Sequence, residues 1–121
     1  MPKTILIVDD EEIVVDITKR KLTQEGFFVI GVNDGEMAIQ ALNQGLVDLI
    51  LLDVEMPKMN GYTFMNERKK IPGAENIPVI VLTAYDSMEP IFRRNNVQAY
   101  LTKPLQFQEV LDKVNEIIGV S

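Results

Sequence analysis

Short apolar runs alternate with segments of helical periodicity along the whole chain, and this alternation restricts the fold more than any other feature. A continuous apolar run is typical of a strand that is covered on both faces, as in parallel sheets. Parallel neighbours need helical crossovers between them, and the intervening segments can supply these. The predicted strands are residues 4–8, 27–32, 47–52, 78–82 and 99–101.

The helices are predicted from the spacing of apolar residues and from the residues at their ends. Asp34 is the expected N-cap of the second helix. Ser87 is expected to cap a short fourth helix, with Pro90 in its first turn, where the missing N–H costs little. The first, second, third and fifth predicted helices are residues 11–24, 36–44, 62–70 and 107–118.

Five strands and five helices in alternation predict a doubly wound (βα)5 three-layer α/β sandwich, with a parallel sheet in the order 2-1-3-4-5. The 121 residues are enough for one hydrophobic core and hardly for two. The sequence stops shortly after the fifth predicted helix, so we expect residues 1–121 to form one domain with no second domain. It has no basic, apolar leader, and we therefore expect a cytoplasmic protein.

The predicted sheet brings polar residues at the ends of its strands to one edge. Strand order reverses between the first and third strands, and binding sites lie beyond the carboxyl ends of strands at such a point. Asp9 and Asp10 follow the first strand, and Asp53 follows the third. Three close carboxylates repel one another unless a cation joins them. Oxygen ligands in small number favour Mg2+, with Mn2+ as the alternative.

Thr83 and Lys103 follow the fourth and fifth strands and add a hydroxyl and an ammonium to the same edge. Taken singly, each of these polar residues is more often a cap, a turn or a strand-end hydrogen bonder. Together they suit the transfer of a phosphoryl group onto a carboxylate, because such transfer needs mainly positioning and charge neutralisation.

Composition excludes several other chemistries. The chain has no cysteine and no histidine, which removes disulfides, thiolate nucleophiles, histidine bases and zinc sites built from these residues. The net charge of -6 argues against nonspecific binding to nucleic acid or anionic lipid. The longest apolar runs are far shorter than a membrane span.

Four segments, in this order, resemble the receiver domain of two-component response regulators, in particular the chemotaxis-regulator type with its flavodoxin-like fold. They are ILIVDDEE (5–12), DLILLDVEMPKMNG (48–61), PVIVLTAYD (78–86) and YLTKP (100–104). The resemblance covers essentially the whole chain, and the four motifs together are far more specific than any one of them.

The resemblance implies a role for each acidic residue and for the lysine. Asp53 matches the phosphoacceptor. Asp10 matches the acidic residue that binds Mg2+ directly, and Asp9 matches its neighbour, which usually acts through water. Glu55 matches the position whose backbone carbonyl is a metal ligand. Lys103 matches the lysine that pairs with the phosphate.

The remaining motif residues match the switch of this family. Thr83 and Tyr100 match a pair in which the hydroxyl moves toward the phosphoryl oxygens and the aromatic ring turns inward behind it. Pro104 follows the lysine through what is usually a cis peptide bond. Ala84 and Tyr85 follow Thr83 and are expected to support the site, with Tyr85 shielding the phosphoryl group from water.

The resemblance also implies partners. A sensor histidine kinase or a histidine phosphotransfer protein would dock near the first helix and donate from a phosphohistidine. Phosphorylation would shift a pre-existing equilibrium on the face formed by the fourth helix and fifth strand. The recipient is a downstream effector or a linked output domain, and a homodimer through the fourth helix, fifth strand and fifth helix is also expected. Such a chain assists its own phosphorylation and dephosphorylation and is not a dedicated enzyme.

One segment departs from the family pattern. Residues 93–99 contain no glycine where the family usually has a Gly-Ala pair, and Thr83 and Tyr100 are slightly closer in sequence than usual. We therefore expect a short or irregular fourth helix, with Asn95 or Asn96 in a left-handed cap.

Three alternatives remain open at this point. A flavodoxin-type cofactor binder would need a hydroxyl- and glycine-rich loop after the first strand, where this chain has four acidic residues, 9–12. A phosphohydrolase with an aspartate nucleophile usually has an Asp-x-Asp motif, where this chain has Asp53-Val54-Glu55. A receiver that acts without phosphorylation, as a protein-interaction module, is the third.

Overall fold

The computed structural model describes residues 2–53, 61–83, 97–103 and 105–119 of the chain. Its five strands are parallel and form one sheet in the order β2-β1-β3-β4-β5, which confirms the predicted topology. The strands are β1 (Thr4–Val8), β2 (Phe28–Val32), β3 (Leu49–Asp53), β4 (Val79–Thr83) and β5 (Val97–Thr102).

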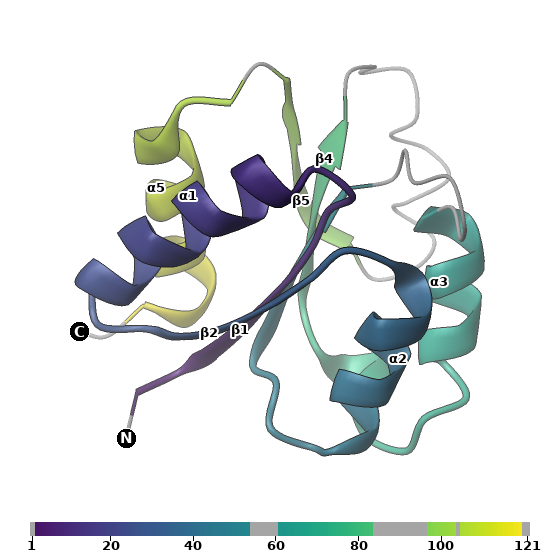
Figure 1. The fold of residues 1–121 in the computed structure, drawn as a ribbon. Helices are drawn as coiled ribbons and strands as arrows, with labels where there is room; N and C mark the ends of the chain where they lie inside the picture. Colours follow the sequence, from purple (N-terminus) through teal and green to yellow (C-terminus); the bar gives the residue numbers. More distant parts are fainter. Residues whose placement is uncertain (1, 54–60, 84–96, 104, 120–121) are drawn as a thin grey trace.

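Helices cover both faces of the sheet, as expected for a three-layer sandwich (Figure 1). Helices α1 (Glu12–Gln24) and α5 (Phe107–Ile118) lie on one face, and α2 (Gly35–Asn43) and α3 (Gly61–Arg68) lie on the other. An unpredicted 3-10 turn, η1 (Ala74–Asn76), precedes β4. The predictions for a short fourth helix at Ser87 and Pro90, and for a left-handed Asn95 or Asn96, fall outside the described residues.

Each face of the sheet has its own hydrophobic core because side chains alternate along a strand. In β3, Ile50 and Leu52 belong to the core under α2 and α3, whereas Leu49 and Leu51 belong to the core under α1 and α5. All four side chains are fully buried, which accounts for the unbroken apolar run. The same alternation assigns a face of the sheet to each polar residue that follows.

Strands β3 and β4 extend one residue further than the sequence predicts. Asp53 pairs with Leu82, and Thr83 pairs with Thr102, so both polar residues are the last residues of their strands. Their backbone positions are therefore fixed by the sheet and not by the loops that follow.

Strand β5 begins at Val97, two residues before the predicted start, so that prediction was wrong. The register shows the cause: Val79 pairs with Val97, but Ile80 pairs with Ala99, which leaves Gln98 as an inserted residue. A bulge of this kind interrupts the period-two pattern from which strands are predicted.

The helix boundaries lie within two residues of the predictions, and α5 has the predicted bounds. Oδ1 of Asp34 accepts a hydrogen bond from the backbone N–H of Met37 at 2.8 Å, which confirms the predicted N-cap of α2. Within the described residues, the structure contains no helix with the length and apolar character needed to cross a membrane.

Helix α1 approaches β2 closely at Gly31. A Cβ atom at this position would lie 2.5 Å from Cγ1 of Val15, well inside van der Waals contact. The missing side chain of Gly31 therefore lets α1 lie low on the sheet, next to the edge where the polar residues collect.

Candidate functional site

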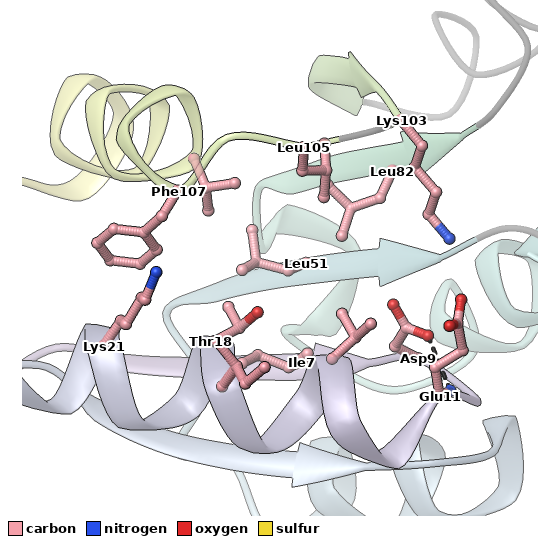
Figure 2. A pocket seen from close by; sticks show the side chains of 13 residues that line it. Ile7, Asp9, Glu11, Thr18, Lys21, Leu51, Leu82, Lys103, Leu105 and Phe107 are labelled. Carbon is pink, nitrogen blue, oxygen red and sulfur yellow. Dashed lines mark hydrogen bonds between the residues drawn. The ribbon is translucent and has the colours of Figure 1, made fainter.

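The carboxyl ends of β1, β3 and β5 bring three charged side chains to one face of the sheet. Asp9 follows β1, Asp53 ends β3 and Lys103 follows β5. Each is two residues beyond a member of the core under α1 and α5, and alternation places it on that face. Figure 2 shows the Lys103 ammonium pointing toward the carboxylate of Asp9.

Asp53 and Lys103 form a largely buried ion pair. Nζ of Lys103 lies 3.3 Å from Oδ1 of Asp53, and the two side chains are 24% and 1% exposed. Burial by itself lowers the pKa of Lys103, but attraction to Asp53 and Asp9 outweighs this effect and raises the pKa above its ordinary value. The lysine therefore stays charged beside a carboxylate that water hardly reaches.

The carboxylate of Asp9 is fully buried, and only one of its two oxygens accepts a hydrogen bond from the described residues. Its Oδ1 accepts a hydrogen bond from the backbone N–H of Glu11 at 3.0 Å, but Oδ2 has no hydrogen-bond partner among the described residues. Burial raises the pKa of Asp9 from 3.8 to about 6, and the charge of Asp53 adds to the shift, while the bond from Glu11 and the charge of Lys103 oppose it. A buried, unpaired carboxylate oxygen is costly unless a cation or donor satisfies it.

Asp10 completes a cluster of carboxylates. One oxygen each from Asp9, Asp10 and Asp53 lies within 4.8 Å of the other two, and Asp10 is exposed to solvent. Carboxylate oxygens at this spacing, in a cluster where Oδ2 of Asp9 has no hydrogen-bond partner among the described residues, suit a hard divalent cation that retains water on its open side. The donor set therefore fits the Mg2+ expected from the sequence.

Thr83 lies at the same edge but on the other face, and Tyr100 lies on that other face three residues before Lys103. Thr83 is 1% exposed, and alternation places it on the face of Val81, under α2 and α3. The half-buried Tyr100 packs against that same core. The backbone N–H of Lys103 donates to the carbonyl of Thr83 at 2.7 Å, so the lysine and the threonine are joined through the main chain.

Four of the site residues predicted from the sequence fall outside the described residues: Glu55, Ala84, Tyr85 and Pro104. Sequence reasoning also missed one contributor, the backbone N–H of Glu11, which orients the carboxylate of Asp9. The signal was present, because an aspartate commonly accepts from the N–H two residues later where a chain turns.

The chain matches the family model described as "Response regulator receiver domain" over residues 5–115. It is 36% identical over 116 residues to the transcriptional regulatory protein CpxR of Escherichia coli, which covers 94% of the chain and 48% of that protein. The chain spans half or less of the first curated relatives it matches, with shares of 44%, 50% and 24%.

Solved structures share the fold, among them two from Thermotoga maritima and Pseudomonas aeruginosa. The response regulator TrrA of Thermotoga maritima, in complex with Mg(2+)-BeF, is 32% identical with a TM-score of 0.82, over 96% of the chain and 99% of that protein. The receiver domain of the sensor histidine kinase PA1611 of Pseudomonas aeruginosa, with a magnesium ion in its active site cleft, is 26% identical with a TM-score of 0.81. That match covers 99% of the chain and 100% of the receiver domain.

Proposed function

The chain belongs to the response regulator receiver domain family, and on that premise we propose that Asp53 accepts a phosphoryl group from a phosphohistidine of a separate protein. The observation that carries the proposal is the buried carboxylate of Asp53, held 3.3 Å from the Lys103 ammonium beside the acidic pair. No other carboxylate of the described residues combines such burial with a lysine partner and two further carboxylates.

The acidic cluster supplies the metal site of this proposal. Asp9, Asp10 and Asp53, with the backbone carbonyl of Glu55, would hold Mg2+ or Mn2+. A bound divalent cation would neutralise the charge that gathers on the transferring phosphoryl group. This role would also give the orphaned Oδ2 of Asp9 the cationic neighbour that it lacks among the described residues.

The transfer itself needs little beyond placement. One carboxylate oxygen of Asp53 attacks phosphorus while the P–N bond to the donor imidazole breaks, and the imidazole leaves with the electron pair. Lys103 stays protonated and compensates the added charge, which is about -1.5 to -2 for a phosphoryl group. The aspartyl phosphate later hydrolyses, so the chain modifies itself and is not a dedicated enzyme.

The two-sided arrangement suggests how the modification is read. Lys103 and Asp53 lie under α1 and α5, whereas Thr83 and Tyr100 belong to the opposite face. The main-chain bond from Lys103 to Thr83 links the faces at the edge of the sheet. Movement of the Thr83 hydroxyl toward the phosphoryl group, followed by Tyr100, would therefore carry the signal through the sheet, with Ala84, Tyr85 and Pro104 shaping the site.

The partners follow from this chemistry. A cytoplasmic sensor histidine kinase or histidine phosphotransfer protein is the donor, and a downstream effector or a covalently linked output domain is the recipient. Residues 1–121 form the receiver domain in this proposal, and a homodimer through the face of β5 and α5 is one route to output.

Labelling with acetyl phosphate and Mg2+ tests the acceptor. The protein is expected to gain the mass of one phosphoryl group, and Asp53→Asn is expected to abolish the gain because the amide is not a nucleophile of this kind. Asp16→Asn, which changes an exposed acid on α1, is the matched control and should label normally. Undiminished labelling of the Asp53 variant would move the acceptor elsewhere.

A further inference from the structure

Four acidic residues follow β1, and the metal site proposed above uses only the first two of them, Asp9 and Asp10. The third, Glu11, lines a cavity of about 310 Å³ between α1 and α5, at the end that Asp9 and Lys103 also line. Figure 2 shows the Glu11 side chain next to the carboxylate of Asp9, on the side of the Lys103 ammonium. This end of the cavity therefore carries one carboxylate more than the proposed transfer requires.

The charge of Glu11 is left over when the other charges of the site are balanced. The three carboxylates of the metal site are offset in full by a bound divalent cation and the Lys103 ammonium, which is already paired with Asp53 at 3.3 Å. Glu11 forms no ion pair with any of the described residues. Once the metal is bound, the described residues of the site therefore present a donor with one net negative charge, which Glu11 supplies.

The rest of the cavity does not compensate this charge. Of the described residues that line it, the second cation is Lys21, whose Nζ lies 5.2 Å from the centroid of the Phe107 ring. Figure 2 shows this contact at the opposite end of the cavity from Glu11. Burial is the largest cause of the raised pKa of Asp9, and the charge of Glu11 adds to it, so the influence of Glu11 reaches the reactive groups.

A phosphoryl donor meets this charge through its leaving group. In an in-line attack the leaving group lies opposite Asp53 across phosphorus, and because Asp53 is 1% exposed, that side is the solvent side, where the exposed Glu11 lies. An acyl phosphate breaks its P–O bond and releases a carboxylate, which keeps the electron pair and gathers negative charge. A donor with a protonated nitrogen breaks its P–N bond and releases a neutral amine or imidazole, which also keeps the electron pair. Neither reaction needs a further proton.

Resting on the phosphoacceptor role proposed above, we propose that Glu11 determines donor specificity: its carboxylate favours donors whose leaving group is a protonated nitrogen over donors whose leaving group is a carboxylate. A phosphohistidine protonated on its second ring nitrogen belongs to the first class, and small acyl phosphates belong to the second. A difference of one unit charge at about 4 Å in water changes a rate roughly fivefold, which is about 1 kcal/mol at about 1.4 kcal/mol per factor of ten. The discrimination due to Glu11 is expected to be of this size.

The test compares labelling by phosphoramidate and by acetyl phosphate at saturating Mg2+, in the parent protein and in Glu11→Gln, which keeps the backbone N–H that donates to Asp9. The substitution is expected to raise kcat/KM for acetyl phosphate roughly fivefold more than for phosphoramidate. The intrinsic reactivity of the donors cancels in this comparison. Raising the salt concentration from about 0.05 M to about 1 M should remove most of the difference, because it shortens the Debye length to about 3 Å.

Glu12→Gln is the matched control, because it removes the same charge one residue later in the chain. Glu12 lines a different cavity, between α1 and β2, and its Oε1 accepts a hydrogen bond from Nδ2 of Asn33 at 3.4 Å. This variant has the same net charge as Glu11→Gln, and it should leave the ratio of the two labelling rates at the parent value.

A second readout does not depend on turnover. Ethylphosphonate and aminomethylphosphonate have the same skeleton, and the second has an ammonium where the first has a methyl group. Their dissociation constants are measured by NMR titration with Mg2+ present, at a mildly alkaline pH where both phosphonates are dianions. The parent protein and Glu12→Gln are expected to bind aminomethylphosphonate roughly fivefold more tightly than ethylphosphonate, and Glu11→Gln is expected to lose this preference.

The outcomes separate the role of Glu11 from the function on which it rests. Equal gains for the two donors in Glu11→Gln, an effect of the same size in Glu12→Gln, or equal binding of the two phosphonates by the parent protein would overturn the role of Glu11 and leave Asp53 as the acceptor. Failure of both donors to label the parent protein would overturn the proposed function and, with it, the role of Glu11.

Discussion

At the scale of single residues, the unusual group is the buried carboxylate of Asp9. The fold removes it from water and gives it one hydrogen bond, from Glu11, while Oδ2 has no hydrogen-bond partner within the described part of the chain. A buried carboxylate oxygen without a partner destabilises the folded protein, and a bound cation can offset this cost. The site is thus arranged for a ligand that brings charge, and the protein is less stable when that ligand is absent.

This cost predicts that the free energy of unfolding of the metal-free protein depends on pH. The pKa of Asp9 is about 6 in the folded state against 3.8 ordinarily, so the folded state holds this proton more tightly. Its contribution to stability is fully present below the unfolded value and is lost as the pH rises through about 6. Asp9→Asn, which cannot ionise, should therefore exceed the parent in stability by an amount that grows from pH 4 to pH 7, to on the order of 2–3 kcal/mol.

Urea unfolding in EDTA at a series of pH values measures this difference. Saturating Mg2+ is the control, because at pH 7 it should raise the stability of the parent protein and leave the stability of the variant unchanged. An Asp9→Asn advantage that stays constant with pH would contradict the assigned cost.

The sequence predicts the acidic cluster but not how the atoms around its side chains are packed. Asp9, Asp10 and Asp53 could be brought together because strand order follows from the alternation of elements, and strand order fixes which strand ends are neighbours. The orphaned oxygen of Asp9 could not be foreseen, because it depends on the packing around one atom. The opposite faces of Asp53 and Thr83 were in principle readable from alternation, but only once both were known to end their strands.

At the scale of elements, the α3–β4 connection is held by an arginine that sequence patterns assign to the surface. Arg68 is fully buried, and its Nη2 donates to the carbonyls of Glu75 at 3.0 Å and Ile77 at 3.1 Å. One side chain therefore ties the last residue of α3 to the turn η1 and to the chain that enters β4. No periodicity reveals such a bond, since it joins an irregular segment to a helix end.

Removal of this guanidinium is expected to be costly. Arg68→Ala leaves two partly buried carbonyls without this donor and opens a cavity, so the free energy of unfolding should fall by roughly 2–4 kcal/mol. Lys69→Ala, at the exposed neighbouring position, should change it by less than about 0.5 kcal/mol. Equal effects of the two substitutions in chemical denaturation would show that Arg68 does not hold the connection.

The approach of α1 to β2 makes a second prediction about elements. Gly31→Ala places a Cβ atom 2.5 Å from Cγ1 of Val15, which must displace the helix, and a cost of about 1–3 kcal/mol is expected. Truncation of the opposing side chain should relieve the clash, so the double variant Gly31→Ala/Val15→Ala should be more stable than the sum of its single effects predicts. Strict additivity in thermal or urea unfolding would contradict the close contact.

At the scale of the whole molecule, the sheet separates two kinds of site residue. The carboxylates and the lysine lie under α1 and α5, beside a cavity lined by residues of these two helices, and Thr83 and Tyr100 belong to the face of α2 and α3. In the proposed function, chemistry at one face is read at the other through strands whose side chains are buried on both faces. The topology could be predicted at this scale, whereas the cavity between α1 and α5 could not, because a cavity depends on the space that the side chains of several elements leave unfilled.

The assignment of Asp53 as the phosphoacceptor is tested by locating the modified residue. Protein treated with acetyl phosphate and Mg2+ is reduced with borohydride, which converts an aspartyl phosphate to homoserine, and the position is read by peptide mass spectrometry. Homoserine is expected at position 53 and at no other aspartate position. Homoserine at Asp9 or Asp10, or a stable phosphate on a hydroxyl group, would contradict it.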